Sequence, residues 1–293
     1  MHIEIDFNRM DDSPAAIRDY LAESGIAARK RWGQNFLFDR PARRMLADLV
    51  EPAPGRRIWE VGAGLGAMTA HLLAGGAAVT AFEIDHGMIR HLHRRFAGCD
   101  RLRVVEGDAA RRIPELRAGG AGEPDALLGN LPYNSAAAIL WASMADGPPI
   151  GRIVCTVQRE MAERMCALPG TRSFGPFSVL CSLEHRARIA RRLPGGCFYP
   201  RPNVESAVVV LDAAGAPPQQ PRARVLALAE AAFAQPRKTL ANNLKSLPGS
   251  REEAERRLMK VGVNPRRRPA TLDMEEIMRL SAAFAEFLPE GAG

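Results

Sequence analysis

Apolar runs that alternate with helical stretches are the feature that most constrains the fold of this chain. Strands are predicted at residues 57–61, 78–84, 102–106, 125–128 and 153–157, and helices at 65–74, 86–97 and 159–168. This alternation predicts an α/β fold with a doubly wound, mostly parallel sheet. Two later segments, at 187–193 and 206–211, are expected to pair as strands, the second being apolar and continuous enough to be buried.

The alternation stops at a segment rich in Pro and Gly, residues 213–221. Beyond it the chain has helical periodicity without strand signals, and helices are expected at 222–235, 237–247, 251–261 and 272–288. Thr271 precedes the last of these and is predicted to cap it. The change of pattern predicts a small all-α domain over residues 215–293.

The composition of the 293-residue chain, with 46% hydrophobic and 25% charged residues, is that of a soluble globular protein. No apolar stretch reaches the about 18 residues of a membrane span, and the acidic N-terminus differs from a signal peptide. We therefore expect a cytoplasmic protein without membrane contact. The five cysteines lack a C-x-x-C pair, which indicates reduced thiols and, with the scattered histidines, no metal site.

The net charge of +7 leans toward the C-terminal part, where residues 217–293 carry 13 basic and 9 acidic side chains. Most of the basic residues are Arg, whose planar side chain suits bidentate contacts to phosphate. Charge alone leaves two interpretations open, a nucleic-acid partner and an ordinary solvated surface.

A glycine-rich turn, EVGAGLG at residues 60–66, joins the first predicted strand to its helix. Such a turn lets a ligand approach the backbone and the free N–H groups of the helix start, although a purely structural turn is the alternative. Glu83 ends the next strand, 21 positions after Gly62, where its carboxylate can accept from both hydroxyls of a ribose. The G-x-G-x-G spacing points away from a dinucleotide. Glu60 fits a nucleoside with an amino-acid tail better than a pyrophosphate.

Two more strand ends carry polar residues. Asp108 follows the third strand and can either cap a turn or accept from the amino group of an adenine. The fourth strand ends in the motif NLPYN, residues 130–134. Because the carboxyl ends of parallel strands share one edge of the sheet, we expect these loops and the glycine turn to face one crevice.

Asn130 and Tyr133 together suit the methylation of an adenine amino group. The lone pair of N6 is delocalised into the ring, so this nitrogen is a poor nucleophile. The amide oxygen of Asn130 and a backbone carbonyl near Pro132 can accept its two hydrogens and direct the lone pair. Tyr133 can stack on one face of the base, worth about 1–3 kcal/mol, and Phe198 on the other. Either ring alone could be a core aromatic, but we do not expect this of both.

Five motifs follow one another along the chain: RKRWGQNFL at 29–37, EVGAGLG at 60–66, NLPYN at 130–134, FYPRPNVESAV at 198–208 and FAQPRKTLANNL at 233–244. In this order they resemble the KsgA/RsmA ribosomal RNA adenine dimethyltransferases. That superfamily includes the Erm resistance methylases and relatives of mitochondrial transcription factor B. The match runs from about residue 20 to the C-terminus.

The resemblance implies a Rossmann-like methyltransferase domain over residues 20–214 and a helical rRNA-binding domain over 215–293, with no usable motif in residues 1–19. The methyl donor is S-adenosyl-L-methionine, and the family's donor contacts fall on Asn35, Leu37, Gly62, Glu83, Asp108 and Asn130. The spacing argument had indicated the last four of these, but not Asn35 or Leu37. The residues expected to act in catalysis are Asn130, Leu131, Pro132, Tyr133 and Phe198.

The resemblance also implies the substrate, two adjacent adenosines in the 3′-terminal hairpin loop of 16S rRNA in the immature 30S subunit. Each receives two methyl groups, and the enzyme takes part in ribosome biogenesis. We expect a monomer whose phosphate-binding surface is formed by Arg237, Lys238 and the arginines at 266–268, although solvated charge is the alternative. The chain departs from the family at Ala63, at Pro236 and at 135–138, where SAAA replaces a sequence such as Ile-Ser-Thr. The last departure bears on target choice.

Three other functions fit parts of the pattern. An Erm-type 23S rRNA adenine N6-methyltransferase has the same site, and a DNA N6-adenine methylase shares its N-x-P-Y motif. A non-catalytic factor in small-subunit assembly requires only the RNA-binding surface.

Overall fold

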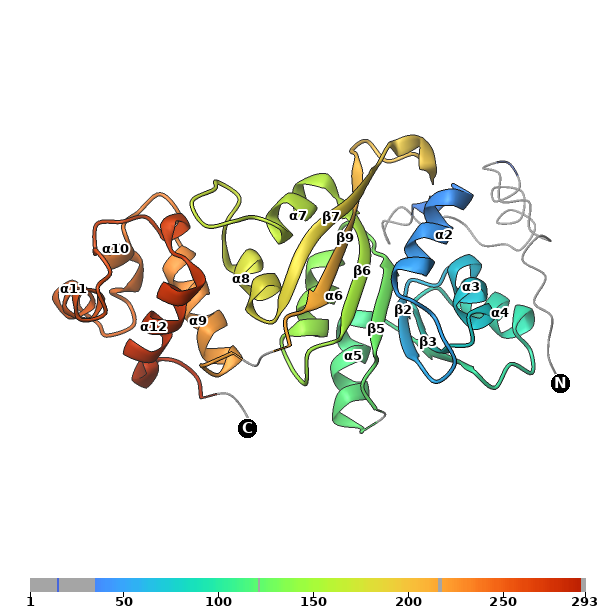
Figure 1. Ribbon diagram of the computed structural model, residues 1–293, viewed down its shortest axis with the longest axis horizontal. Helices are drawn as coiled ribbons and strands as arrows, with labels where there is room; N and C mark the ends of the chain where they lie inside the picture. The colour runs from blue at the N-terminus through green and yellow to red at the C-terminus, as the bar shows by residue number, and fades with distance from the viewer. Residues whose placement is uncertain (1–14, 16–34, 121, 216–217, 291–293) are drawn as a thin grey trace. The chain divides into compact units, whose positions relative to one another are not determined.

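The computed structural model describes residues 15, 35–120, 122–215 and 218–290 (Figure 1). The expected extension at 1–19 and the first part of the RKRWGQNFL motif lie outside these residues, apart from residue 15. The chain forms two compact units. Of the described residues, the first unit contains 35–162 and Arg188–Ala213, and the second contains Glu163–Ala187 and the chain beyond Ala213.

The first unit is built on a seven-stranded sheet with the order β4-β3-β2-β5-β6-β9-β7. Its strands are β2 (Arg57–Val61), β3 (Ala78–Glu83), β4 (Leu102–Glu106), β5 (Ala126–Asn130), β6 (Arg152–Gln158), β7 (His185–Leu193) and β9 (Ser206–Ala213). Strands β2 to β6 run parallel, and β9 is antiparallel to β6. The prediction of a mostly parallel, doubly wound sheet is therefore confirmed. Because β2 lies between β3 and β5, the order of connection switches at its carboxyl end, where such sheets bind ligands.

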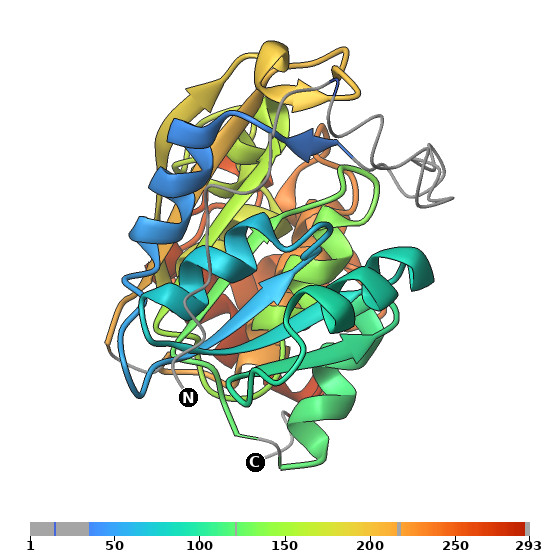
Figure 2. The ribbon, with the colours of Figure 1, turned by 90° about the vertical axis from the view of Figure 1, so that its right-hand side faces the viewer.

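Helices cover both faces of this sheet (Figures 1 and 2). Residues of α2 (Arg40–Leu49), α3 (Ala67–Ala74) and α4 (His86–Arg95) share one buried cluster with alternate residues of the strands, such as Ile58. Trp59 points to the other face, where its ring packs on Phe82 and under the guanidinium of Arg117 from α5. The period-2 alternation of buried side chains thus explains the two layers.

Four helices, α2, α5 (Ala109–Ala118), α6 (Ala136–Met144) and α8 (Pro176–Leu183), and one small sheet were not predicted from the sequence. Helix α6 is apolar on most sides and so lacks an amphipathic pattern, and α5 has Pro114 in its interior. The small sheet pairs β1 (Phe36–Leu37) antiparallel to β8 (Phe198–Tyr199), with Leu37 opposite Phe198. Strands of two residues are too short to show periodicity in the sequence. The sheet that they form nevertheless brings distant parts of the chain together.

The second unit is helical apart from the first residues of β7. Its helices are α8 (Pro176–Leu183), α9 (Arg222–Phe233), α10 (Leu240–Leu244), α11 (Arg251–Lys260) and α12 (Met274–Ala283), and α7 (Arg159–Met165) spans the boundary between the units. The prediction that Thr271 caps the last helix is wrong. Asp273 caps this helix instead, in a reciprocal capping box with Glu276, because Thr271 belongs to a short 3-10 turn.

The division into units differs from the predicted domains at one place. Residues 163–187 were expected in the first domain, but they group with the C-terminal helices, and the ring of Phe174 packs on that of Phe233. No helix in the described part of the chain is long and apolar enough to cross a membrane. None of the five cysteines, all of which lie in the described part of the chain, forms a disulfide.

Candidate active site

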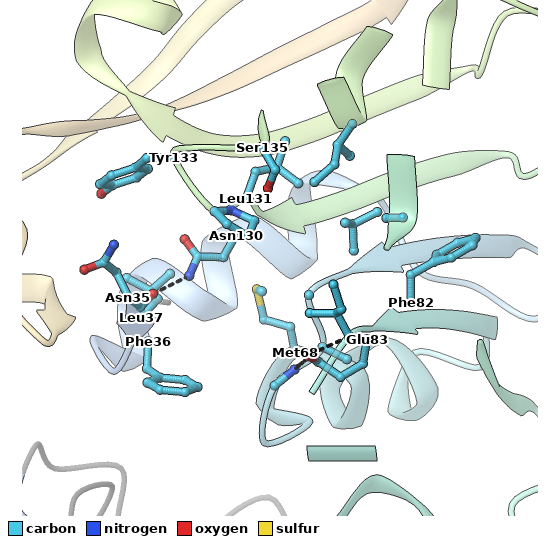
Figure 3. Close-up of a pocket in the computed structure, with 18 of the residues that line it drawn as sticks. Asn35, Phe36, Leu37, Met68, Phe82, Glu83, Asn130, Leu131, Tyr133 and Ser135 are labelled. Carbon is cyan, nitrogen blue, oxygen red and sulfur yellow. Dashed lines mark hydrogen bonds between the residues drawn. The ribbon is translucent and has the colours of Figure 1, made fainter. Parts of the chain in front are cut away.

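A cavity of about 260 Å³ opens at the carboxyl ends of β2, β3 and β5. Figure 3 shows side chains from several loops converging on it. Its lining includes the following predicted site residues: Asn35, Leu37, Gly62, Glu83, Asp108, Asn130, Leu131, Pro132 and Tyr133. Phe198 is not among them.

The glycine turn forms one wall of the cavity. Gly62 and Gly64 have φ angles of +75° and +56°, in the left-handed region that favours glycine. A Cβ on Gly62 would meet only the carbonyl oxygen of Asn130, at 3.7 Å, so it would project into open cavity space. Gly66 has a different role, because a Cβ there would lie 2.6 Å from the ring of Phe96. The first two glycines therefore bring bare backbone to the cavity, whereas the third allows helix packing.

The carboxylate of Glu83 is buried at the end of β3, with 5% of its surface exposed. It accepts hydrogen bonds from the backbone N–H groups of Gly64 at 2.8 Å, Ile84 at 2.9 Å and Asp85 at 3.0 Å. Burial raises its pKa, and the three donors oppose that shift. A carboxylate has about four acceptor positions. The predicted contact to both ribose hydroxyls therefore requires one of these backbone bonds to be shared.

Glu60 lies beneath the glycine turn rather than in the cavity wall, contrary to its predicted place beside the donor's tail. Its side chain is fully buried, and Oε2 accepts from the hydroxyl of Thr69 at 2.6 Å. The other oxygen, Oε1, has no hydrogen-bond partner. Burial raises the pKa of Glu60 to about 8, so the carboxyl is mostly protonated at neutral pH.

Asp108 serves as the N-cap of α5 and also lines the cavity. Its Oδ1 accepts from the N–H of Ala110 at 3.0 Å, which confirms the capping alternative. The cap fixes the carboxylate at the cavity wall, where its contact to an adenine amino group stays a prediction.

The amide of Asn130 is oriented by a hydrogen bond across the cavity entrance. Its Nδ2 donates to the backbone carbonyl of Asn35 at 2.7 Å (Figure 3). A carbonyl can only accept, so the NH₂ group must face Asn35 and the amide oxygen is left for another donor. This bond depends on the pairing of β1 with β8, which the sequence did not reveal.

The backbone after Asn130 supplies a further acceptor. The carbonyl of Pro132 already accepts from the N–H groups of Ser135 at 3.1 Å and Ala136 at 2.9 Å, at the start of α6. Of the carbonyls near Pro132, the better candidate for a ligand is therefore that of Leu131, whose residue also lines the cavity.

Tyr133 lies at the rim of the cavity (Figure 3). Its hydroxyl shares a hydrogen bond with the Ser206 hydroxyl at the start of β9, and burial raises the pKa of the phenol. Ser206 was not predicted to have a role. The only sequence signal that could have indicated a role for Ser206 was its position in the family-like motif FYPRPNVESAV, residues 198–208.

Phe198 is placed in the core, which corrects the prediction that it stacks on a base opposite Tyr133. Only 2% of its surface is exposed, and it shares a buried cluster with Leu37 and Leu46. The cause is the pairing of β8 with β1, which fixes Phe198 opposite Leu37 in the small sheet. A different ring, that of Phe36, lines the cavity and would lie 3.5 Å from a Cβ on Gly64.

The basic residues expected to bind phosphate differ in their surroundings. Arg237, Lys238, Arg266 and Arg268 are exposed. Arg267 instead forms an ion pair with Glu276 at 2.5 Å and bonds to Thr271, so its guanidinium supports the helical unit. The phosphate-binding role of the other four stays a prediction.

Comparison with known proteins decides the family, because residues 25–286 match the family described as ribosomal RNA adenine dimethylase. The chain belongs to this family. A relative in Treponema pallidum, "Ribosomal RNA small subunit methyltransferase A", is 38% identical over 94% of this chain and 98% of its own length. A protein of the same name in Myxococcus xanthus is 38% identical over 93% of this chain and 96% of its own.

Two solved structures share the fold of the dimethylase family. A dimethyladenosine transferase from Plasmodium falciparum has a TM-score of 0.71 with 20% identity, covering 85% of this chain and 97% of that one. The 23S rRNA methyltransferase ErmE has a TM-score of 0.62 with 23% identity, covering 86% and 100%. The first unit is thus a Rossmann-like methyltransferase domain, as predicted.

As a member of the dimethylase family, the protein is a methyltransferase that uses S-adenosyl-L-methionine. The cavity fits this donor on its own terms. Gly62 leaves room that a side chain would fill, and Glu83 and Asp108 place carboxylates along the wall. Carboxylates of this kind accept hydrogen bonds from ribose hydroxyls and an adenine amino group.

Proposed function

We propose that the protein methylates N6 of two adjacent adenosines in the 3′-terminal hairpin loop of 16S rRNA, giving dimethyladenosines in the immature 30S subunit. It acts in the cytoplasm, as a monomer, during ribosome biogenesis. The observation that carries the proposal is the fixed amide of Asn130, which presents its oxygen beside the ring of Tyr133 at the cavity mouth. The names of the relatives in Treponema and Myxococcus support the small subunit as the target.

The residues of the inner cavity hold and orient the donor. Glu83 and Asp108 would bind its nucleoside part, and the backbone at Gly62 and Asn35 would lie beside its amino-acid tail. When bound, S-adenosyl-L-methionine supplies an electrophilic methyl group on a sulfonium ion. The contribution of the chain is therefore mainly positioning in a cavity that excludes water.

The residues of the cavity mouth orient the acceptor. An unpaired adenosine leaves its stack at a cost of a few kcal/mol, lowest in a loop, and its base stacks on Tyr133. The amide oxygen of Asn130 and the carbonyl of Leu131 accept the two N6 hydrogens, which draws the nitrogen toward tetrahedral geometry. Its lone pair then points into the cavity.

Residues 130–135, the described lining of the cavity mouth, include no general base. They are Asn, Leu, Pro, Tyr, Asn and Ser, without a carboxylate or an imidazole. Amide and carbonyl oxygens accept hydrogen bonds but do not take up protons at neutral pH. The proton of the methylated nitrogen therefore leaves to water.

Mass spectrometry of rRNA digests tests the proposal directly. Immature small subunits are incubated with the protein and isotopically labelled S-adenosyl-L-methionine, and dimethyladenosine is expected at two adjacent positions of the 3′-terminal hairpin. In a parallel incubation with large-subunit rRNA, label there instead would favour the Erm-type alternative, and primer extension can map the position. A site-dead variant that transfers no methyl group but still occupies immature subunits would reveal an assembly role.

A further inference from the structure

One exposed cluster of arginines is not explained by the donor site or by the helical unit. We define the arginine face as Arg40 and Arg44 on α2, Arg191 and Arg192 at the end of β7, and Arg201 after β8. All five are exposed and belong to the first unit. Because they come from three segments of the chain, their proximity must be established from contacts.

Helix α2 connects the cavity to this face. Arg43 lines the cavity, and the sulfur of Met45 lies 4.0 Å from Nη1 of Arg191 on β7. Successive helix residues are rotated by about 100°. Arg40 and Arg44 therefore project between the side of α2 that faces the cavity and the side that faces β7. The basic side chains thus run from the cavity over α2 to the end of β7.

The loop after β7 brings in the last arginine. The side chain of Arg201 lies against Gly195, since a Cβ on that glycine would be 3.3 Å from Cγ and Nε of Arg201. Between these two residues lies β8, which pairs with the cavity-lining residues Phe36 and Leu37 of β1. The end of β7, Arg201 and the cavity are therefore joined through one small sheet.

Two carboxylates of the neighbouring segments, those of Asp39 and Asp212, have partners outside the arginine face. Asp39 caps α2 through the N–H of Ala42 at 2.8 Å, and Asp212 pairs with Arg152 at 2.6 Å. Within the described part of the chain, no ion pair joins Arg44, Arg191, Arg192 or Arg201 to a carboxylate. Exposed guanidinium groups without acidic partners are suited to phosphate oxygens.

We propose that the arginine face binds the phosphodiester backbone of the RNA strand that flanks the target adenosine. This inference rests on the proposed function and adds a second RNA-binding surface on the methyltransferase domain itself. A strand whose base enters the cavity past Tyr133 must continue across neighbouring protein surface. The row of guanidinium groups that begins at Arg43 offers it a path of complementary charge.

Salt-dependent RNA binding tests the arginine face. We would compare wild type with the triple variant Arg44→Gln, Arg191→Gln, Arg192→Gln, which leaves Arg43 and the cavity intact. The probe is a synthetic RNA hairpin with two adjacent adenosines in its loop. Each lost phosphate contact decreases the magnitude of the negative slope of log K against log salt by about 0.7. The loss of three contacts is therefore expected to decrease it by about 2. Affinity at low salt should fall about tenfold or more.

Two matched variants act as controls. Arg90→Gln, Arg94→Gln, Arg103→Gln also removes three positive charges, from exposed positions on α4 and β4, and should leave the slope unchanged. Arg44→Lys, Arg191→Lys, Arg192→Lys keeps the charge and should keep the slope within about half a unit. Thermal unfolding and calorimetric binding of S-adenosyl-L-methionine should match wild type in all three, so a folding defect is recognised independently.

Vesicles of anionic phospholipid serve as a second probe. The inference would be overturned by an unchanged slope in the face variant or by an equal reduction in the control variant of α4 and β4. It would also be overturned if the face variant lost binding to the vesicles but not to the RNA. The test is separable from the proposed function. If wild type failed to methylate small-subunit RNA, the proposed function would fail. Binding to an unrelated single-stranded RNA would still show whether the arginine face contacts phosphates.

Discussion

Nδ2 of Asn130 donates a hydrogen bond to the backbone carbonyl of Asn35 at 2.7 Å, joining residues 95 positions apart. The bond leaves the amide oxygen of Asn130 as an acceptor at the cavity mouth. Asn130→Asp replaces the donor with a second oxygen that repels the Asn35 carbonyl. We expect kcat/KM for RNA methylation to fall about 100-fold or more, as when other preorganised polar groups are removed.

The control for this substitution is Asn203→Asp, which makes the same chemical change at an exposed loop position. It should leave kcat/KM within about twofold of wild type, because surface substitutions rarely have large effects. Activity of Asn130→Asp close to that of wild type at neutral pH would show that the Asn35 contact does not orient a catalytic amide.

Tyr133 is expected to act through its ring more than through its hydroxyl. Tyr133→Ala removes a stack worth about 1–3 kcal/mol, which corresponds to a loss of about 5- to 150-fold in kcat/KM. Tyr133→Phe keeps the ring and loses only the hydrogen bond to Ser206, so its loss should be smaller. Calorimetry should give donor affinity near wild type for both; a parallel loss of donor affinity after Tyr133→Ala would contradict the stacking role.

The parts of the site that the sequence predicted are those with local signals. Gly62 was recognised because a glycine turn between a strand and a helix has a characteristic spacing, and Glu83 because it ends the next strand. The carboxyl ends of parallel strands must meet at one edge, so local motifs sufficed to bring Asp108 and Asn130 to one cavity.

The parts that were missed depend on contacts between distant segments. Phe198 is buried because two-residue strands, β1 and β8, pair across the chain, and such strands have no period that can be read. The same pairing places Asn35 beside Asn130. The bond between Tyr133 and Ser206 likewise joins β9 to the loop after β5, which only the strand order of the sheet could reveal.

The buried carboxyl of Glu60 is expected to make stability depend on pH. Its pKa is about 8 in the folded protein against a model value of 4.5, so the folded state binds the proton more tightly. Its contribution to the free energy of unfolding is present below pH 4.5 and is lost as pH rises through 8. Glu60→Gln keeps an oxygen for the Thr69 hydroxyl and cannot ionise.

Urea unfolding between pH 5.5 and 8.5 measures this contribution. Wild type should lose stability relative to Glu60→Gln over this range, by up to a few kcal/mol, since each pKa unit corresponds to about 1.4 kcal/mol. Parallel pH dependences of the two proteins would mean that Glu60 does not carry a raised pKa.

Gly62 is expected to matter more for donor binding than for stability. Gly62→Ala places a methyl group in the cavity, 3.7 Å from the Asn130 carbonyl, at a φ of +75°. The left-handed backbone costs about 1–2 kcal/mol for an L-residue, and donor affinity should fall by about tenfold or more as the cavity narrows.

Gly55→Ala is the matched control, because Gly55 has a φ of +83° with nothing within 4 Å of the added Cβ. Both variants should lose similar stability in urea unfolding, and calorimetry should show weaker S-adenosyl-L-methionine binding for Gly62→Ala alone. Equal donor affinities in the two variants would show that the glycine turn does not form the donor's cradle.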